Sequence, residues 1–403
     1  MSASILARVA LSYAPMIDRQ RAVIATRLTL FPLRPGEPLD VGELLEALAA
    51  VWPEGAGEVS LNLLSESLLH ELMAAQPARH LGVEVPAFMA ADPAHAEVIA
   101  ALAARGNTLL IKGRPPRELP RELLPCFRQS IIDLAEDRRL HEPLGQPSPM
   151  PRSIGFIQSG IHSLAEMEAS FARGAIAVLG WPFQDALDRR SPPAGRAGGQ
   201  ASAELQVLMD MMRQLQSGSS VEELESTLSR DPRLAFRLLR YLNSPAFGLA
   251  VEVSSFRHAI MLLGSQRLLR WLALLLATAS EDLNLRPLMF AAVRRGLLME
   301  ELLQRSGYEE LAGECFICGV FSLLDQLLDQ PFEALFRSLP VPDHVRQALV
   351  EGRGPCMPYL RLVQAVEGDD LDPIREAFAS LFSYAGETNE ALLAALARAA
   401  TLR

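Results

Sequence analysis

Apolar and polar positions follow one pattern in the first half of the chain and another in the second half. From Ile5 to about Leu187, short apolar segments alternate with stretches whose apolar residues have the spacing of amphipathic helices. Strands that alternate with helices predict a mostly parallel sheet, and eight of them predict a (β/α) barrel. We expect these strands at Ile5–Leu11, Val23–Leu30, Val59–Leu63, Leu81–Val85, Thr108–Ile111, Ile131–Ile132, Ser153–Ile157 and Ala175–Leu179. We expect helices at Leu44–Val51, Leu68–Ala75, Ala94–Ala104 and Leu164–Ala172.

A break in this pattern separates the two halves. Residues 188–200 concentrate proline and glycine without apolar periodicity, which is typical of a linker. After Ala201 the signals are helical to the end of the sequence. We therefore predict an α/β domain at 1–187, a linker at 188–200 and an all-α domain at 201–403.

The beginnings of two helices are marked clearly in the second half. Ser220, followed three residues later by Glu223, has the spacing of a capping box. Asp231 supplies an N-cap carboxylate, and Pro232 occupies the first helical position, where a missing amide hydrogen costs nothing.

Two later positions end helices. Asn243 and Ser244 form a corner before Pro245, because a proline disfavours the helical conformation of the residue that precedes it. Gly264 ends the next short helix, and Ser265 begins a longer one. We assign Asp231, Pro232, Asn243, Ser244 and Gly264 structural roles in these tight connections.

These residues carry a resemblance to a known family. Residues 228–248 (LSRDPRLAFRLLRYLNSPAFG), followed by 259–264 (AIMLLG), resemble the HDOD domain, a helical bundle related to HD phosphohydrolases. The resemblance implies an output or interaction domain of bacterial signalling proteins, without established catalysis of its own.

The order of the two halves resembles the EAL–HDOD arrangement, in which the EAL domain is a barrel phosphodiesterase of cyclic di-GMP. The resemblance of the first half depends on scattered landmarks at Tyr13–Asp18, Val59–Asn62, Gly82–Glu84, Gly106–Gly113 and Gly174–Pro182. It implies divalent metal ions held by carboxylates at the strand ends, together with a positioned water.

Most of the implied metal ligands are replaced in this sequence. Arg27 stands where the resemblance implies the signature glutamate, and Lys112 stands in the place of an acidic pair. Asn62, Glu84 and Asp133 remain as vestigial matches. These three residues cannot neutralise two metal ions, and the positive side chains of Arg27 and Lys112 would repel the metal ions. We therefore predict a degenerate barrel with no metal, no cofactor and no enzyme activity.

A purely structural role for the three vestigial residues is the stronger alternative. Asn62 would close a turn at a strand end, whereas Glu84 and Asp133 would be exposed or paired carboxylates.

Metal catalysis also lacks ligands in the second half. None of the seven histidines precedes an aspartate, and Ser322-Leu323 stands where an HD-like domain carries its dyad. Cys315 and Cys318 have a zinc or redox spacing, but without a second ligand pair we interpret them as buried core thiols.

Arginines recur at helical spacing along the Arg230–Arg240 stripe. Arg233, Arg237 and Arg240 are our candidate interaction surface for a protein partner. Phosphate binding is an alternative, but no aromatic residues interleave with the arginines, so we do not expect nucleic acid.

Composition narrows the class of protein further. A net charge of −10 disfavours general adhesion to nucleic acid or anionic lipid, and 49% hydrophobic residues indicate packed cores. Four scattered cysteines suit a reducing cytoplasm, and the longest apolar runs are about half the length of a membrane span.

The sequence thus predicts a non-catalytic, cytoplasmic signal-transduction or scaffold protein that acts through protein–protein contacts. Its link to cyclic di-GMP signalling comes from resemblance. Two alternatives remain. One is a residual cyclic di-GMP receptor or phosphodiesterase, although we expect no cyclic di-GMP binding; the other is a nucleic-acid-binding regulator that uses the arginine stripe.

Overall fold

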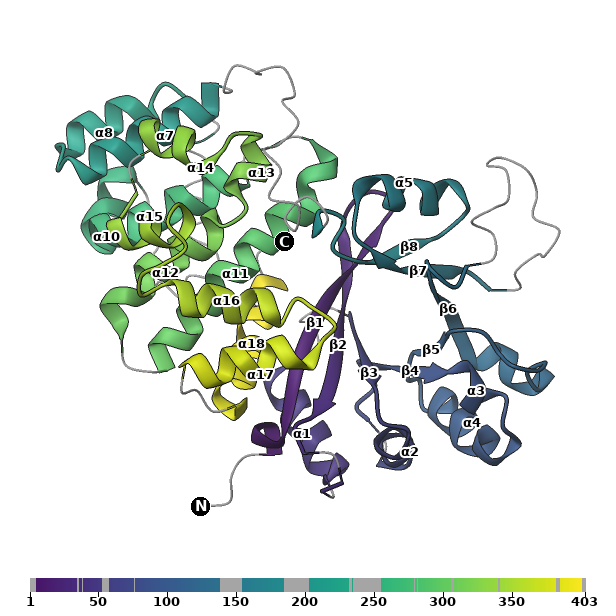
Figure 1. The fold of residues 1–403 in the computed structure, drawn as a ribbon. Coiled ribbons are helices and arrows are strands. Elements are labelled where there is room, and N and C mark those ends of the chain that lie inside the picture. The colour runs from purple at the N-terminus through teal and green to yellow at the C-terminus, as the bar shows by residue number, and fades with distance from the viewer. Residues whose placement is uncertain are drawn as a thin grey trace. The chain divides into compact units, whose positions relative to one another are not determined.

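Two compact units make up the chain in the computed structural model (Figure 1). The barrel unit combines residues 1–190 with 364–397, and the helical unit combines 191–363 with 398–403. The structure describes residues 5–34, 36–37, 39–52, 58–75, 77–137, 154–184, 203–231, 234, 255–278, 280, 282–305, 308–339, 341–381 and 385–400. The predicted linker at 188–200 lies outside these ranges.

The barrel is closed by eight strands in sequence order. Seven neighbouring pairs follow the chain, and β1 pairs with β8 to complete the circle. Strand β1 is antiparallel to both of its neighbours, whereas the pairs from β2–β3 to β7–β8 are parallel. The strands are β1 (Val9–Asp18), β2 (Val23–Pro32), β3 (Glu58–Leu63), β4 (Leu81–Pro86), β5 (Leu109–Lys112), β6 (Phe127–Asp133), β7 (Phe156–Ile161) and β8 (Ala177–Gly180).

The prediction of a mostly parallel eight-stranded barrel followed by an all-helical region is confirmed. The first strand was placed too early: Ile5–Arg8 forms a 3-10 helix (η1), and β1 begins at Val9. Ile5 and Leu6 are buried like the residues of β1, so hydrophobicity alone could not separate the two elements. The remaining helical elements between the strands are α1 (Val41–Val51), α2 (Glu66–Ala75), α3 (Ala87–Ala90), η2 (Pro93–His95), α4 (Ala96–Ala104), η3 (Arg121–Cys126) and α5 (Leu164–Ala172).

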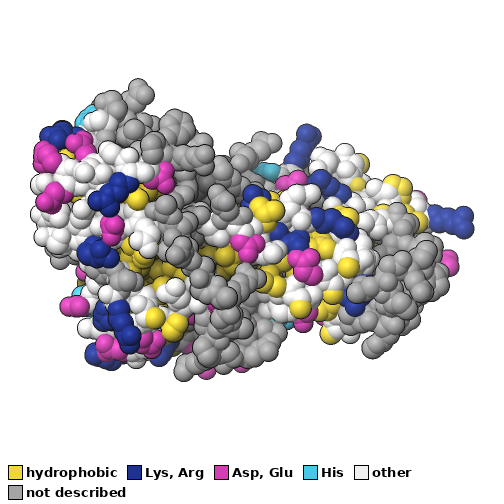
Figure 2. All heavy atoms as spheres, turned by 90° about the horizontal axis from the view of Figure 1, so that it is seen from above, with side chains coloured by type: hydrophobic (Ala, Val, Ile, Leu, Met, Phe, Trp, Pro, Cys, Tyr) yellow, Lys and Arg dark blue, Asp and Glu magenta, His cyan; other side chains and the backbone are white. Residues whose placement is uncertain are grey.

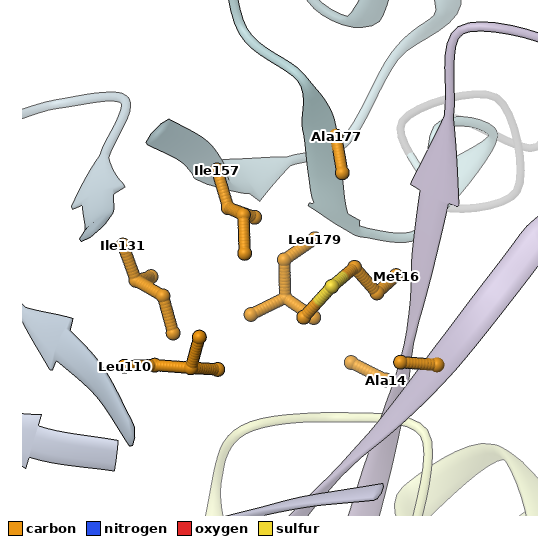
Figure 3. Packing of buried hydrophobic residues seen from close by; sticks show 8 residues of the cluster. Ala14, Met16, Leu110, Ile131, Ile157, Ala177 and Leu179 are labelled. Carbon is orange, nitrogen blue, oxygen red and sulfur yellow. The ribbon is translucent and has the colours of Figure 1, made fainter. Parts of the chain in front are cut away.

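Apolar side chains from six strands fill the barrel interior (Figure 3). They point toward one another from opposite walls, as in the packed interior of a (β/α) barrel rather than a pore. The cluster consists of Ala14, Met16, Ala25, Leu110, Ile131, Ile157, Ala177 and Leu179.

The end of the chain returns to pack on the barrel. Helices α17 (Leu371–Leu381) and α18 (Ala385–Ala400) follow β1 and β2 closely in Figure 1. Asn389 is buried here: its amide nitrogen donates to the carbonyls of Leu6 and Val9 at 2.8 Å each, and its oxygen accepts from the Leu11 amide at 3.2 Å. The predicted C-terminal domain had included residues 364–397, because an amphipathic helix pattern does not specify which core the helix covers.

Helices alone form the described part of the helical unit. Ser220 and Glu223 make the predicted capping box at the start of α8. The helices are α7 (Ala203–Gln216), α8 (Val221–Leu228), α10 (Phe256–Ala277), η6 (Leu283–Leu285), α11 (Arg286–Arg305), α12 (Glu309–Phe321), α13 (Leu324–Leu328), α14 (Phe332–Ser338), α15 (Asp343–Leu349) and α16 (Met357–Ala365). Among the described residues, no helix combines the length and hydrophobicity that crossing a bilayer requires.

Close backbone contact between α11 and α12 requires glycine. A Cβ atom added to Gly319 would lie 2.6 Å from the backbone nitrogen of Gly296, and one added to Gly296 would lie 2.9 Å from the carbonyl oxygen of Phe316. Both distances are shorter than a side-chain carbon tolerates, so the two glycines set the separation of these helices.

We expect Asn389→Ala to lower the free energy of unfolding of the barrel unit by about 2–4 kcal/mol, because it leaves three buried backbone groups without a partner. Urea unfolding followed by tryptophan fluorescence measures the change. Glu376→Ala, at an exposed position of α17, is the control and should leave the midpoint unchanged. Equal midpoints for the two variants would contradict the role of Asn389.

Candidate functional site at the carboxyl ends of the barrel strands

A polar layer lies beyond the apolar layer of the barrel. Side chains two residues apart on a strand point to the same side of the sheet. The residue two positions after each apolar interior residue therefore also points into the barrel. Arg27 follows Ala25, Lys112 follows Leu110, Asp133 follows Ile131 and Ser159 follows Ile157. On the parallel strands this layer is at the carboxyl end, where barrel enzymes carry their active sites.

A buried ion pair dominates this layer. Arg27 Nη2 donates to Glu84 Oε2 at 2.6 Å, and Ser60 Oγ donates to Glu84 Oε1 at 3.0 Å. The side chains of Arg27 and Glu84 are 9% and 0% exposed. Each charge is therefore compensated within the barrel, as a buried charge must be.

Asn62 is also engaged by its neighbours. Lys112 Nζ donates to Asn62 Oδ1 at 2.8 Å, and Asn62 Nδ2 donates to Thr29 Oγ1 at 3.1 Å. The amide bridges strands β2, β3 and β5, rather than closing the strand-end turn that was its alternative role.

Lys112 is the only lysine of the sequence. Burial lowers its pKa below the ordinary lysine value, and the positive charge of Arg27 lowers it further. The carboxylates of Glu84, Asp369 and Asp133 act in the opposite direction. Asp369 comes from the segment before α17, which sequence reasoning assigned to the other domain; no periodicity signal could have placed it here.

Asp133 has a local partner as well. Its Oδ1 accepts from the backbone amide of Ala135 at 3.0 Å, and its Oδ2 accepts from Ser159 Oγ at 3.4 Å. The carboxylate thus ties the turn after β6 to β7. Although Asn62, Glu84 and Asp133 lie at the same end of the barrel, each is bonded to a different set of neighbours.

The arrangement mixes two cations with three carboxylates. Arg27 and Lys112 have the chemistry to bind a phosphate ester, but their strongest contacts are to Glu84 and Asn62. Within the part of the chain that the structure describes, no group of three or more His, Cys, Asp or Glu side chains is arranged to hold a metal ion.

In the helical unit, two of the predicted structural residues are described. Asp231 Oδ1 accepts from the Leu234 amide at 3.0 Å, which is the bond of a helix N-cap. Gly264 has φ of 71° and interrupts α10 at the predicted position, because glycine adopts this left-handed conformation without strain. Pro232, Asn243, Ser244 and the candidate surface Arg233, Arg237 and Arg240 lie outside the described residues.

Arginines beside this stripe pair with carboxylates. Arg257 contacts Glu222 and Glu225 at 3.0 Å each, and Arg230 lies 3.7 Å from Asp210. Figure 2 shows acidic and basic side chains interspersed on the face that it draws of the helical unit. These pairs do not favour the alternative of a phosphate-binding stripe.

The position of the missing His-Asp dyad is filled by a different contact. Ser322 Oγ accepts from Arg295 Nη1 at 3.1 Å and donates to the carbonyl of Gly319 at 2.7 Å. This buried hydroxyl links α11 to the end of α12.

We expect the sole lysine to become reactive at lower pH than an ordinary lysine, because its lowered pKa leaves more neutral amine. Acetylation of Lys112 by acetic anhydride across a pH series, measured by mass spectrometry, gives the midpoint. Arg27→Met should raise that midpoint and Asp133→Asn should lower it, whereas Arg128→Met should not move it. Shifts in the same direction for the first two variants would refute the assignment.

Comparisons with known proteins agree with the predicted arrangement. Residues 205–328 match the model of the HDOD domain. The chain is 28% identical over 176 residues to the cyclic di-GMP phosphodiesterase CdgJ of Vibrio cholerae serotype O1. The aligned segment covers 43% of this chain and 41% of CdgJ. It is 29% identical over 161 residues to the uncharacterized protein YuxH of Bacillus subtilis. This aligned segment covers 39% of this chain and 39% of YuxH. The chain therefore spans about two fifths of the length of these curated relatives.

Solved structures resemble the barrel half only distantly. A standalone EAL protein from Vibrio cholerae O395, in its cyclic di-GMP-bound form, is 17% identical with a TM-score of 0.32. The alignment covers 44% of this chain and 91% of that protein.

The prediction that the chain is not an enzyme is wrong by this comparison, because the matched relative CdgJ is a phosphodiesterase. The prediction had counted acidic side chains on the expected strands alone, whereas the structure adds Asp369 to the charges around Lys112. The resemblance itself is confirmed: residues 205–328 match the HDOD domain, and in sequence they follow a closed eight-stranded barrel.

Proposed function

We propose that this chain is a component of cyclic di-GMP signalling that transmits its signal by binding a protein partner. The observation that supports this proposal over phosphate binding is the pairing of charges within the barrel. The Arg27 guanidinium is held by Glu84, and the Lys112 ammonium is held by Asn62, so the two cations are occupied within the chain. The match of residues 205–328 to the HDOD domain supports the same proposal.

The partner surface that we propose is the arginine stripe Arg233, Arg237 and Arg240. An acidic partner surface fits it, because guanidinium groups pair with carboxylates in two-pronged geometry. The neighbouring contacts of Arg257 with Glu222 and Glu225 show the same pairing within the chain.

We expect Arg237→Glu to weaken partner binding at least about tenfold, because a like-charge contact replaces an attractive one. Partners are first identified by crosslinking and mass spectrometry in native cells. The affinity of the purified partner for the full chain is then measured by calorimetry. Arg337→Glu on α14 is the matched control, an exposed arginine of the same unit. Equal affinities for both variants would remove the stripe from the proposal.

A second candidate function is binding or hydrolysis of cyclic di-GMP at the carboxyl ends of the barrel strands. The identity with CdgJ favours it. Arg27 and Lys112 could contact the phosphates, provided that Glu84 and Asn62 release them.

This candidate predicts heat on titration of the full chain with cyclic di-GMP and magnesium or manganese. Lys112→Met should reduce the affinity at least about tenfold by removing a charge-assisted contact, whereas Arg128→Met should not change it. Chromatography of the linear dinucleotide product separates hydrolysis from binding. Absence of both heat and product would eliminate the candidate without affecting partner binding.

A further inference from the structure

Three buried thiols meet in the helical unit, at a place that the proposed function does not use. Cys315 and Cys318 are three residues apart on α12 and therefore lie on one face of that helix. Cys356 comes from the segment that directly precedes α16. All three residues are 0% exposed. The sequence had indicated a pair of core cysteines, and only the fold adds the third.

The sulfur atoms contact one another directly. Cys315 Sγ donates to Cys356 Sγ at 2.7 Å, across 41 residues of sequence. Cys318 lies on the same face of α12 as Cys315, and its interaction with Cys356 raises the pKa of its thiol. Thiols that served only as small apolar side chains would not need to bring two sulfur atoms this close.

The three groups differ in their affinity for a proton. Hydrogen bonds from Cys315 and Cys318, helped by the charge of His344, lower the pKa of Cys356 to about 4. The same bonds and burial raise the pKa of Cys315 and of Cys318. Cys356 is therefore the sulfur of the cluster that gives up its proton most readily. A thiolate beside a thiol is the arrangement of a peroxide-reactive cysteine with its resolving partner.

We propose that Cys315 and Cys356 form a reversible disulfide when a small hydroperoxide reaches the cluster. Hydrogen peroxide is little larger than water, whereas full burial of the sulfurs excludes a bulky disulfide such as oxidised glutathione.

The reaction has two balanced steps. The Cys356 thiolate attacks one peroxide oxygen, the O–O bond breaks, and the departing hydroxide takes a proton to leave as water; Cys356 becomes a sulfenic acid. The sulfur of Cys315 then attacks the Cys356 sulfur, its proton leaves with the sulfenic hydroxyl as a second water, and the S–S bond forms. Two sulfurs lose two electrons in total to one peroxide molecule.

The bond would join α12 to the start of α16. It would close a loop of 41 residues and so reduce the conformational freedom of the unfolded helical unit. Oxidation should therefore raise the unfolding temperature of this unit, and reduction by dithiothreitol should restore the original value.

Cys126 provides an internal reference. It is the fourth cysteine, it lies in the barrel unit, and it is partly exposed. In the native chain it should react with a maleimide while the other three thiols remain unmodified.

The test is peptide mapping of the full chain after treatment with hydrogen peroxide. The chain is then blocked with iodoacetamide in denaturant and digested with trypsin and chymotrypsin. Cleavage after Phe316 separates Cys315 from Cys318, and Cys356 lies on a tryptic peptide of its own between Arg353 and Arg361. We expect a peptide pair joined through Cys315 and Cys356, absent after dithiothreitol treatment.

Two serine variants test which cysteines form the disulfide. Cys126→Ser should retain the linked pair, and Cys356→Ser should lose both the linkage and the oxidation-dependent rise in unfolding temperature. Four free thiols after peroxide treatment, further oxidation of Cys356 to the sulfinic acid without linkage, or a link through Cys318 would each overturn the proposal. The mapping of the unmodified sequence decides the question even if a serine variant fails to fold.

Discussion

The barrel depends on the ion pair between Arg27 and Glu84. A charge moved from water into a protein interior costs several kcal/mol unless a counter-charge and hydrogen bonds compensate it. Glu84 is fully buried and receives both a guanidinium and the Ser60 hydroxyl, so its charge is compensated twice. The ammonium of Lys112 donates to Asn62 beside this pair. The pair thus fixes Arg27, Ser60 and Glu84 relative to one another, while Asp133 is held separately by Ala135 and Ser159.

The same pair limits the availability of Glu84 as a metal ligand. A carboxylate that neutralises an internal guanidinium is a poorer ligand for a divalent ion, since the ion must first displace that partner. The relative CdgJ is a phosphodiesterase, and residue replacements alone did not justify the opposite conclusion for this chain.

Local sequence patterns predicted much of this fold, because strand alternation and helix capping act over a few residues. The strands near Val23, Val59 and Leu81 and the capping box at Ser220 were each placed within a few residues. Contacts between distant segments were not predicted, since apolar periodicity shows that a face is buried but not against what. Asp369 near Lys112 and Cys356 beside Cys315 are both of this kind.

The barrel unit is discontinuous in sequence, and this has a consequence for biosynthesis. Leu6 and Asn389 are separated by 383 residues, yet they share a buried hydrogen bond. At ordinary rates of translation, the ribosome needs roughly 20–80 s to make the intervening chain. Throughout that time the carbonyls of Leu6 and Val9 lack the Asn389 amide as a partner. Residues 205–328, which match the HDOD domain, are synthesised between these two parts of the barrel unit. The first strand can therefore pair with β2 as soon as β2 is made, whereas its contacts with Asn389 form only after α18 has been synthesised.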